Sequence, residues 1–223
     1  MIYVTGDVHG KYDDFVNRMY QAGIKTGDTV IVCGDFGLVW NDEYHRFFLK
    51  ALANQPFNVL FVDGNHEDFD LLYTYHVEQW NGGKVHRIAD NIFHLIRGQV
   101  FEIDGKKFFT MGGAYSIDKA MRREGISWWK AELPTNEEYR TAGENLGKYG
   151  YSVDYVITHT IPQSAIHRLG RVPATEDGEL TGYFEWLYSE KLEFKKWFAG
   201  HWHKNILINE NLQILLDEVQ AIE

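Results

Sequence analysis

The chain has 223 residues, of which 44% are hydrophobic and 24% are charged, and its formal net charge at pH 7 is −10. This length suits one sizeable core, so we expect a single domain over residues 1–223. The acidic charge and the lack of a lysine or arginine run argue against stable binding of duplex nucleic acid.

Three further features concern where the protein works. No run of about 18 apolar residues is present, which argues against a membrane span. The N-terminus leads directly into an apolar strand, without a basic region or a cleavage site, so we expect no signal peptide. Cys33 is the only cysteine. It excludes an internal disulfide and favours a reducing compartment, and we therefore expect a cytoplasmic protein.

The first third of the chain alternates short apolar runs with amphipathic segments. The run Thr29–Cys33 is almost wholly apolar, as expected of a strand that is buried on both faces. Phe15, Met19 and Ala22 lie at helical spacing, and Gly23 follows as a stop. The patterns predict strands at residues 2–4, 29–33 and 58–62, and helices at residues 12–22, 42–53 and 69–75. This alternation is typical of βαβ units and a parallel sheet.

The rest of the chain adds shorter strands and two hairpins. Asp104-Gly105 suits the type I′ turn of a hairpin over residues 100–111, which indicates an antiparallel second sheet or an extension of the first. We expect strands at residues 92–96, 153–158 and 194–199, helices at residues 136–146 and 181–192, and a closing hairpin over residues 205–217. Residues 114–152 are the most irregular part, and we expect them to form an excursion on the substrate side.

Side chains that can bind metals follow five of the predicted strands. Asp7 and His9 come after the first strand, where extended backbone would point side chains i and i+2 the same way, toward one ion. The others are Asp35, Asn65, His66, His159, His201 and His203. In open α/β sheets the functional site lies at the carboxyl ends of the strands, so we expect these side chains to gather there.

The donor types favour transition metals. Two carboxylates, one amide oxygen and five imidazoles suit first-row transition metals better than calcium or a lone magnesium. The set is too large for one ion and fits two, and a carboxylate is the natural bridge between ions roughly 3.5–4 Å apart. We expect two divalent ions, manganese first, with iron, zinc or nickel as alternatives.

In order and approximate spacing, these motifs resemble those of the calcineurin-like metallophosphoesterase superfamily. The matching elements are Asp7-x-His9, Gly34-Asp35, Gly64-Asn65-His66, His159 and Gly200-His201-x-His203, and they span nearly the whole chain. The resemblance implies an α/β (α+β) fold of four layers, in which two packed mixed β-sheets are flanked by helices, with a dinuclear metal centre. It assigns Asp7, His9 and His203 to the first metal, Asn65, His159 and His201 to the second, and Asp35 to the bridge between them.

The same resemblance implies a catalytic role for His66. This residue would sit beside the leaving group without binding metal, and as an imidazolium it would protonate the departing alkoxide. A metal-bridging hydroxide would attack phosphorus, because two cations lower the pKa of a bound water. The implied function is metal-dependent hydrolysis of a phosphate ester. We expect a small phosphorylated substrate or a nucleotide, while the sequence predicts no oligomeric state.

The residues after Asp35 depart from the Ser/Thr phosphoprotein phosphatase branch. That branch has Val-Asp-Arg-Gly, whereas this chain has Phe36-Gly37-Leu38-Val39. The aspartate that would orient the catalytic histidine and the arginine that would grip the phosphate are both missing there. The segment Gly112–Arg122, which continues to Trp128-Trp129, instead resembles one found in bacterial and phage members. It suggests a bacterial or phage source but no particular substrate.

Alternatives stay open for several residues and for the activity. Arg122 either grips the phosphate or forms an i,i+4 ion pair with Asp118 on a helix. Trp128 and Trp129 either stack a base or plug the space beneath their loop. The alternative enzyme is a phosphodiesterase acting on cyclic nucleotides or nucleic-acid ends. The alternative of another class is a non-catalytic metal-binding interaction scaffold, which the retention of every ligand and of His66 argues against.

Overall fold

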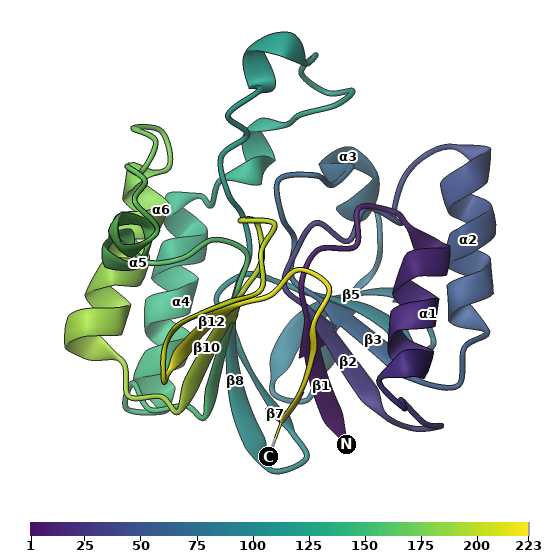
Figure 1. Cartoon of the computed structure of the whole chain (residues 1–223), viewed down its shortest axis with the longest axis horizontal. Coiled ribbons are helices and arrows are strands. Elements are labelled where there is room, and N and C mark those ends of the chain that lie inside the picture. The colour runs from purple at the N-terminus through teal and green to yellow at the C-terminus, as the bar shows by residue number, and fades with distance from the viewer. Residues whose placement is uncertain (223) are drawn as a thin grey trace.

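The computed structural model describes residues 1–222. In this part of the chain a seven-stranded sheet and a six-stranded sheet pack face to face, and helices cover their outer faces (Figure 1). The arrangement has four layers, in the order helix, sheet, sheet, helix. None of the described helices is both long and apolar enough to span a bilayer.

The first sheet contains the N-terminal parallel strands. Its strands are β1 (Ile2–Thr5), β2 (Thr29–Val32), β3 (Asn58–Phe61), β4 (Val77–Trp80), β5 (Gly83–Ala89), β6 (Ile92–Leu95) and β13 (Val219–Ile222). They lie in the order β13-β1-β2-β3-β6-β5-β4, and β1, β2, β3 and β6 run parallel. The helices α1 (Tyr12–Gln21), α2 (Glu43–Ala53) and α3 (Phe69–Leu72) belong to this half of the molecule.

The second sheet contains the predicted hairpins. Its strands are β7 (Gln99–Ile103), β8 (Lys106–Met111), β9 (Tyr155–Thr158), β10 (Lys196–Ala199), β11 (Ile206–Asn209) and β12 (Leu212–Ile214). They lie in the order β11-β12-β10-β9-β8-β7, and β8, β9, β10 and β12 run parallel. The helices α4 (Asn136–Lys148), α5 (Gln163–Arg168) and α6 (Gly178–Trp186) belong to this half. Both sheets are mixed, as predicted.

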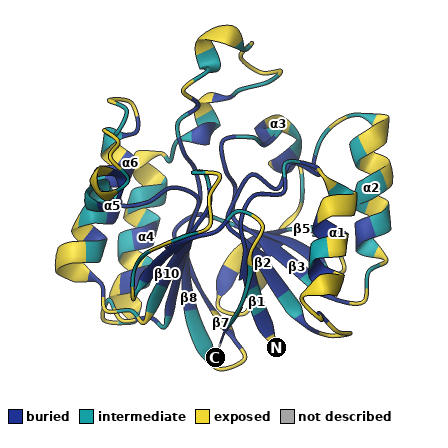
Figure 2. Ribbon diagram, in the orientation of Figure 1, coloured by how far each residue is buried: buried dark blue, intermediate teal, exposed yellow. Residues whose placement is uncertain are grey.

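The sequence of strand β2 is almost wholly apolar because its side chains enter two different cores. Ile31, with Cys33 just beyond the strand, contributes to the core between the sheets, together with Leu60 of β3. Val30 and Val32 instead join the core that includes residues of α1 and α2. Both faces of the strand are therefore buried, which confirms the prediction from the apolar run. Figure 2 shows the same contrast between the buried strands and the exposed outer surfaces of the helices.

The excursion after β8 rises beyond the carboxyl ends of the strands (Figure 1). It contains two 3₁₀ turns, Lys119–Met121 and Lys130–Glu132, and leads into α4. Trp129 is 7% exposed, and its ring lies 5.7 Å from that of Trp40 and 6.5 Å from that of Phe69, measured between centroids. For Trp129, the prediction of an aromatic plug beneath the loop is confirmed. The excursion is thus anchored to the body close to the strand ends.

Four elements were not expected from the sequence, namely β4, β5, α5 and β13. The helix expected at residues 181–192 begins earlier, at Gly178, and ends at Trp186, where a π-helical turn over Leu187–Lys191 follows. The expected strand over residues 212–217 is shorter, because the chain leaves the second sheet after Ile214 and returns to pair with β1 as β13. Strand β13 thereby becomes an antiparallel edge strand of the first sheet.

Candidate metal centre

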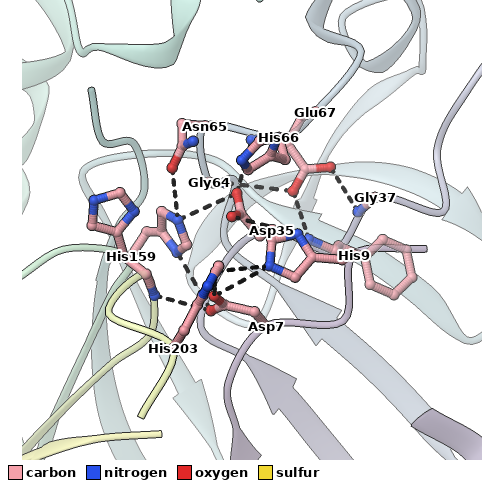
Figure 3. Close-up of polar contacts among 12 residues, drawn as sticks. Asp7, His9, Asp35, Gly37, Gly64, Asn65, His66, Glu67, His159 and His203 are labelled. Carbon is pink, nitrogen blue, oxygen red and sulfur yellow. Dashed lines mark hydrogen bonds and ion pairs between the residues drawn. The ribbon is translucent and has the colours of Figure 1, made fainter. Parts of the chain in front are cut away.

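The five predicted strand ends meet in one place. Strands β1, β2 and β3 of the first sheet and β9 and β10 of the second all end beside it, and their following loops carry the predicted side chains (Figure 3). The site therefore lies where the carboxyl edges of the two sheets come together, as the strand pattern predicts.

Three donor atoms converge around one point. His9 Nε2 lies 3.0 Å from His203 Nε2, and Asp7 Oδ2 lies 3.3 Å from His203 Nε2 and 3.6 Å from His9 Nε2. Ligands bound about 2.1 Å from one ion are separated by about 3.0 Å in octahedral and about 3.4 Å in tetrahedral geometry. Oδ2 of Asp7 is also buried without a hydrogen-bond partner within the described chain. These atoms fit a single metal ion.

A second group of donors lies beside the first. His159 Nε2 is 3.2 Å from Asn65 Oδ1 and 3.2 Å from Asp35 Oδ1. His159 Nδ1 is 2.7 Å from the carbonyl oxygen of Cys33, which requires a proton on Nδ1 and directs Nε2 toward the site. The ring of His201 packs edge-on against His159, with 5.0 Å between centroids. This group offers donors for a second ion.

Asp35 lies between the two groups. Its Oδ1 faces His159, while its Oδ2 is 3.8 Å from Nδ1 of His9. Asp35 also belongs with Asp7, His9 and His203 to a cluster whose ligand atoms all lie within 4.8 Å of one another. The backbone N–H of His66 donates to Oδ1 over 2.8 Å and fixes the carboxylate. Its two oxygens therefore point toward different donor groups, as a bridging ligand requires.

The charges of the site suit a cation between the carboxylates. Burial raises the pKa of Asp35, but His159 outweighs this effect and holds the pKa well below its usual range. Burial lowers the pKa of His159, but Asp35 and Asp7 raise it to about 10. Burial and His159 together lower the pKa of His201 to about 3. The carboxylates thus remain ionised inside the protein, and positive charge is what stabilises them there.

The backbone is strained at four of these positions. The φ angles of His9, Asp35, His201 and His203 are 52°, 47°, 68° and 49°, in the left-handed region that costs of order 1–3 kcal/mol for such residues. The expectation that extended backbone aligns Asp7 with His9 is therefore wrong, because β1 ends at Thr5 and a turn brings the two together. Surrounding packing must hold these turns in place.

The sequence matches the family described as calcineurin-like phosphoesterase over residues 1–205. The chain belongs to this family. Among curated proteins, no relative matches it.

Solved structures with a similar fold are distant in sequence. This chain shares 13% identity and a TM-score of 0.50 with a putative 5′-nucleotidase from Staphylococcus aureus in complex with alpha-ketoglutarate, over 96% of this chain and 48% of that one. The sulfate thiohydrolase SoxB from Thermus thermophilus, in complex with glycerol, gives 14% identity and a TM-score of 0.40, over 94% and 36%. The chain spans about half the length of the 5′-nucleotidase. The likeness to that protein supports the four-layer fold alone.

His66 and Arg122 lie together at the edge of the donor groups. Arg122 Nη1 is 2.9 Å from His66 Nδ1, and Nη2 is 3.1 Å from Nε2. Arg122 Nε also donates to Asp118 Oδ2 over 2.9 Å. The predicted ion pair with Asp118 is therefore present, although only a 3₁₀ turn precedes Arg122. Both side chains line a cleft of about 620 Å³ that also borders Asp35, Asn65, His201 and His203.

A buried residue that the sequence did not single out, Glu67, supports the loops of the site. The Glu67 carboxylate accepts hydrogen bonds from the backbone N–H groups of Phe36 and Gly37 over 2.8 and 3.1 Å. Burial and the nearby Asp35 raise the pKa of Glu67 to about 8. In the sequence, only its position directly after Gly64-Asn65-His66 indicated that Glu67 belongs to the site. Glu67 thereby ties the loop after β3 to the loop after β2.

Proposed function

We propose that the chain is a phosphate-ester hydrolase that uses two divalent metal ions. The observation that carries this proposal is the pair of donor groups with Asp35 between them. Asp7, His9 and His203 would hold the first ion, Asn65, His159 and His201 the second, and Asp35 would bridge them. Manganese is the first candidate, since a mixed imidazole and carboxylate set accepts several transition metals.

The ions would supply a nucleophilic hydroxide near neutral pH and would neutralise charge on the phosphate. The protein's own residues fix where that chemistry occurs. Asp7 and Asp35 stay ionised because neighbouring histidines lower their pKa values, so both remain ligands at neutral pH. The backbone carbonyl of Cys33 accepts a hydrogen bond from Nδ1 of His159. This bond sets the His159 imidazole in the tautomer that presents Nε2 to the site.

His66 and Arg122 would handle the phosphate and the leaving group. The Arg122 guanidinium, held by Asp118, would donate hydrogen bonds to phosphate oxygens from the wall of the cleft. His66 would donate a proton to the leaving oxygen. Burial and the positive charge of Arg122 lower the pKa of His66. The negative charge of a bound phosphate would offset the effect of Arg122 on this pKa. The two residues would therefore act on the same substrate group.

A phosphodiesterase is the second candidate, and one observation favours it. A separate hollow of about 500 Å³ borders Asp7 and His9 and is also lined by Lys11 and Arg18. The larger cleft borders the same centre at His203 and His66. A phosphodiester carries two ester substituents on phosphorus, so a second hollow that borders the centre suits it. Cyclic nucleotides and nucleic-acid ends are the substrates that this alternative proposes.

The test compares p-nitrophenyl phosphate with bis-p-nitrophenyl phosphate. Chelator-treated protein is given manganese, nickel, zinc or magnesium in turn, and bound metal is counted by elemental analysis. We expect hydrolysis that depends on two bound ions, and hydrolysis of the diester would favour the second candidate. Protein that binds no metal would contradict the proposal, whereas two bound ions without hydrolysis would favour a scaffold.

The variant His66→Asn separates an enzyme from a scaffold. We expect a fall in kcat of about 10²- to 10⁴-fold with both ions retained, because general acid catalysis contributes that much. A scaffold would bind metal in both forms and show no turnover in either. The cytoplasmic location and the small phosphorylated substrate stay predictions.

A further inference from the structure

The cleft beside the metal centre is larger than a phosphate group needs. Its volume of about 620 Å³ lies within the range of sites that bind a drug-sized ligand. Besides the metal ligands and His66, residues of the loop between α5 and α6 line it, among them Arg171 and Val172. A phosphate held at the metal centre would therefore leave room in the cleft for the rest of the ester.

The three carboxylates that line this cleft have other roles or partners. Asp35 lies between the two metal donor groups, and Asp118 forms an ion pair with Arg122. Asp177 is 5% exposed, and the backbone N–H of Tyr115 donates to its carboxylate. None of the three forms an ion pair with the second arginine of the cleft.

That second arginine, Arg171, has no acidic partner among residues 1–222. Its side chain is exposed and makes no ion pair or hydrogen bond within this part of the chain. The nearby Glu176 instead accepts a hydrogen bond from the hydroxyl of Tyr115 over 3.1 Å, which joins the loop to the excursion. The protein has 32 acidic side chains and 22 lysines and arginines, yet this arginine of the cleft is left unpaired. Arg171 is therefore available to an anionic group of the ligand.

Apolar side chains accompany Arg171 along the wall of the cleft. Val172 follows it directly and is 82% exposed, and Ile117 of the excursion is 84% exposed. Aliphatic side chains beside a polar site are covered when a hydrocarbon part of the ligand lies against them. The cleft thus offers the metal centre with Arg122 for one anion, an apolar wall, and Arg171 for another anion.

We propose that Arg171 forms a subsite for a second anionic group, so that the substrates are phosphate esters with a carboxylate or a further phosphate at a distance from the ester. This inference rests on the proposed function, because it assigns the substrate class of the same site. The phosphate to be hydrolysed would lie between the metal ligands and Arg122, and the hydrocarbon chain would pass Ile117 and Val172. The guanidinium of Arg171 presents paired N–H donors that match two oxygens of a carboxylate or a phosphate.

The test uses straight-chain phosphate monoesters of three to eight carbons that differ only at the far end. Each chain ends in a carboxylate, a second phosphate or a neutral primary amide, and the amide is the uncharged counterpart of the carboxylate. With manganese-loaded protein, we expect a chain length at which an anionic end raises kcat/KM about five- to tenfold over the amide, since an ion pair at an exposed arginine contributes little more than this. The better anionic end identifies the second group as a carboxylate or a phosphate.

Variants of three arginines separate the subsite from its surroundings. Arg171→Gln should reduce the preference for an anionic end to less than about twofold. Arg168→Gln is the matched control and should keep the preference, because Arg168 at the end of α5 is also exposed and unpaired but does not line the cleft. Arg122→Ala should lower the rates with both kinds of end and leave their ratio in place. A preference that survives Arg171→Gln would overturn the inference.

Binding without chemistry separates this inference from the proposed function. Alkylphosphonates of the same lengths, ending in a carboxylate, a second phosphonate or an amide, cannot be hydrolysed at phosphorus, and calorimetry gives their dissociation constants. We expect a preference of about five- to tenfold for an anionic end, lost in Arg171→Gln and kept in Arg168→Gln. Equal binding and equal rates for anionic and neutral ends at every length would overturn the inference. Selective binding without any hydrolysis would instead contradict the proposed function alone.

Discussion

The guanidinium of Arg122 faces both ring nitrogens of His66, with Nη1 2.9 Å from Nδ1 and Nη2 3.1 Å from Nε2. A neutral imidazole has only one nitrogen that can accept, so at most one of these contacts is a hydrogen bond. Arg122 is held in this position by Asp118 and by the carbonyl of Ser127. A positive charge therefore contacts the ring of the proposed general acid. An arginine in this position is suited to share a phosphate with the histidine.

Replacing Arg122 with alanine should weaken turnover without removing metal. Loss of hydrogen bonds from a charged donor to the phosphate should lower kcat/KM by about 10- to 100-fold. Asp118→Asn, which loosens the arginine but keeps its charge, should have a smaller effect. Arg140→Ala is the control, because Arg140 forms its ion pairs on the exposed surface of α4. An Arg122→Ala variant as active as the control would show that Arg122 does not bind the phosphate.

A buried ion pair behind the site should contribute strongly to stability. Arg97 donates to Asp63 Oδ2 over 2.8 Å, and its Nη2 reaches the carbonyl of Ala131 over 2.7 Å. Asp63→Asn should lower the free energy of unfolding by about 3–5 kcal/mol, because it leaves the buried Arg97 charge with only its longer contact to Glu138, at 3.6 Å. The pair also joins the strand end before Asn65 to the excursion that carries Arg122. Loss of activity should therefore accompany loss of stability.

The control for this change is an exposed ion pair of the same type. Asp154 pairs with Lys195, whose side chain is 68% exposed. Asp154→Asn should change the free energy of unfolding by less than about 1 kcal/mol. Urea denaturation of both variants, each compared with the unchanged protein, gives the two differences. Equal effects of the two substitutions would contradict the assignment of the buried pair.

The strand-end residues could be predicted because their pattern is local. An apolar run followed by Gly34-Asp35 or Gly64-Asn65 marks both the strand and its carboxyl end. Because parallel strands place their carboxyl ends at the same edge of a sheet, these residues were expected to lie together. In the structure the carboxyl ends of β1, β2, β3, β9 and β10 lie beside one another. The backbone turns could not be predicted in the same way. His9 has the left-handed conformation in a turn whose backbone N–H groups donate to the carbonyls of Asp35 and Phe36, in the loop after β2.

Long-range partners account for most of what the sequence did not indicate. Strand β13 forms only by pairing with β1, from which it is separated by almost the whole chain. Arg97 carries no pattern that identifies Asp63 as its partner, since the two come from different strand ends. Asp177 appears as an ordinary helix N-cap in the sequence, and only the structure shows that its side chain makes no capping hydrogen bond with α6.

Adding one methyl group at Gly200 should disrupt the first donor group. A Cβ atom there would lie 2.2 Å from Asp7 Oδ1, an overlap that must displace the carboxylate. Gly200→Ala should therefore lower metal stoichiometry from two ions toward one or none, measured by elemental analysis after dialysis. Gly147→Ala in α4 is the matched control, because nothing lies within 4 Å of its added Cβ. That change should raise stability by roughly 0.5–1 kcal/mol and leave metal content unchanged.

The carboxyl of Asp177 should make stability depend on pH with an unusual sign. Burial raises its pKa from 3.8 to about 6 in the folded protein, so the folded state binds its proton more tightly than the unfolded state does. Its contribution to stability is then present below pH 4 and is lost as pH rises through about 6. Asp177→Asn removes the cost of ionisation. Its stability gain over the unchanged protein should grow by about 2 kcal/mol between pH 4.5 and pH 8.

The matched substitution Asp42→Asn should give the opposite dependence. The N–H of His45 donates to Asp42 and lowers its pKa, so ionised Asp42 stabilises the fold above its unfolded pKa, and that stability is lost as pH falls. The loss of stability in Asp42→Asn should therefore be larger at pH 8 than in acid. Urea denaturation of chelator-treated protein at both pH values measures each difference. If Asp177→Asn were destabilising to the same extent at both pH values, burial would not raise the pKa of Asp177 in the folded protein.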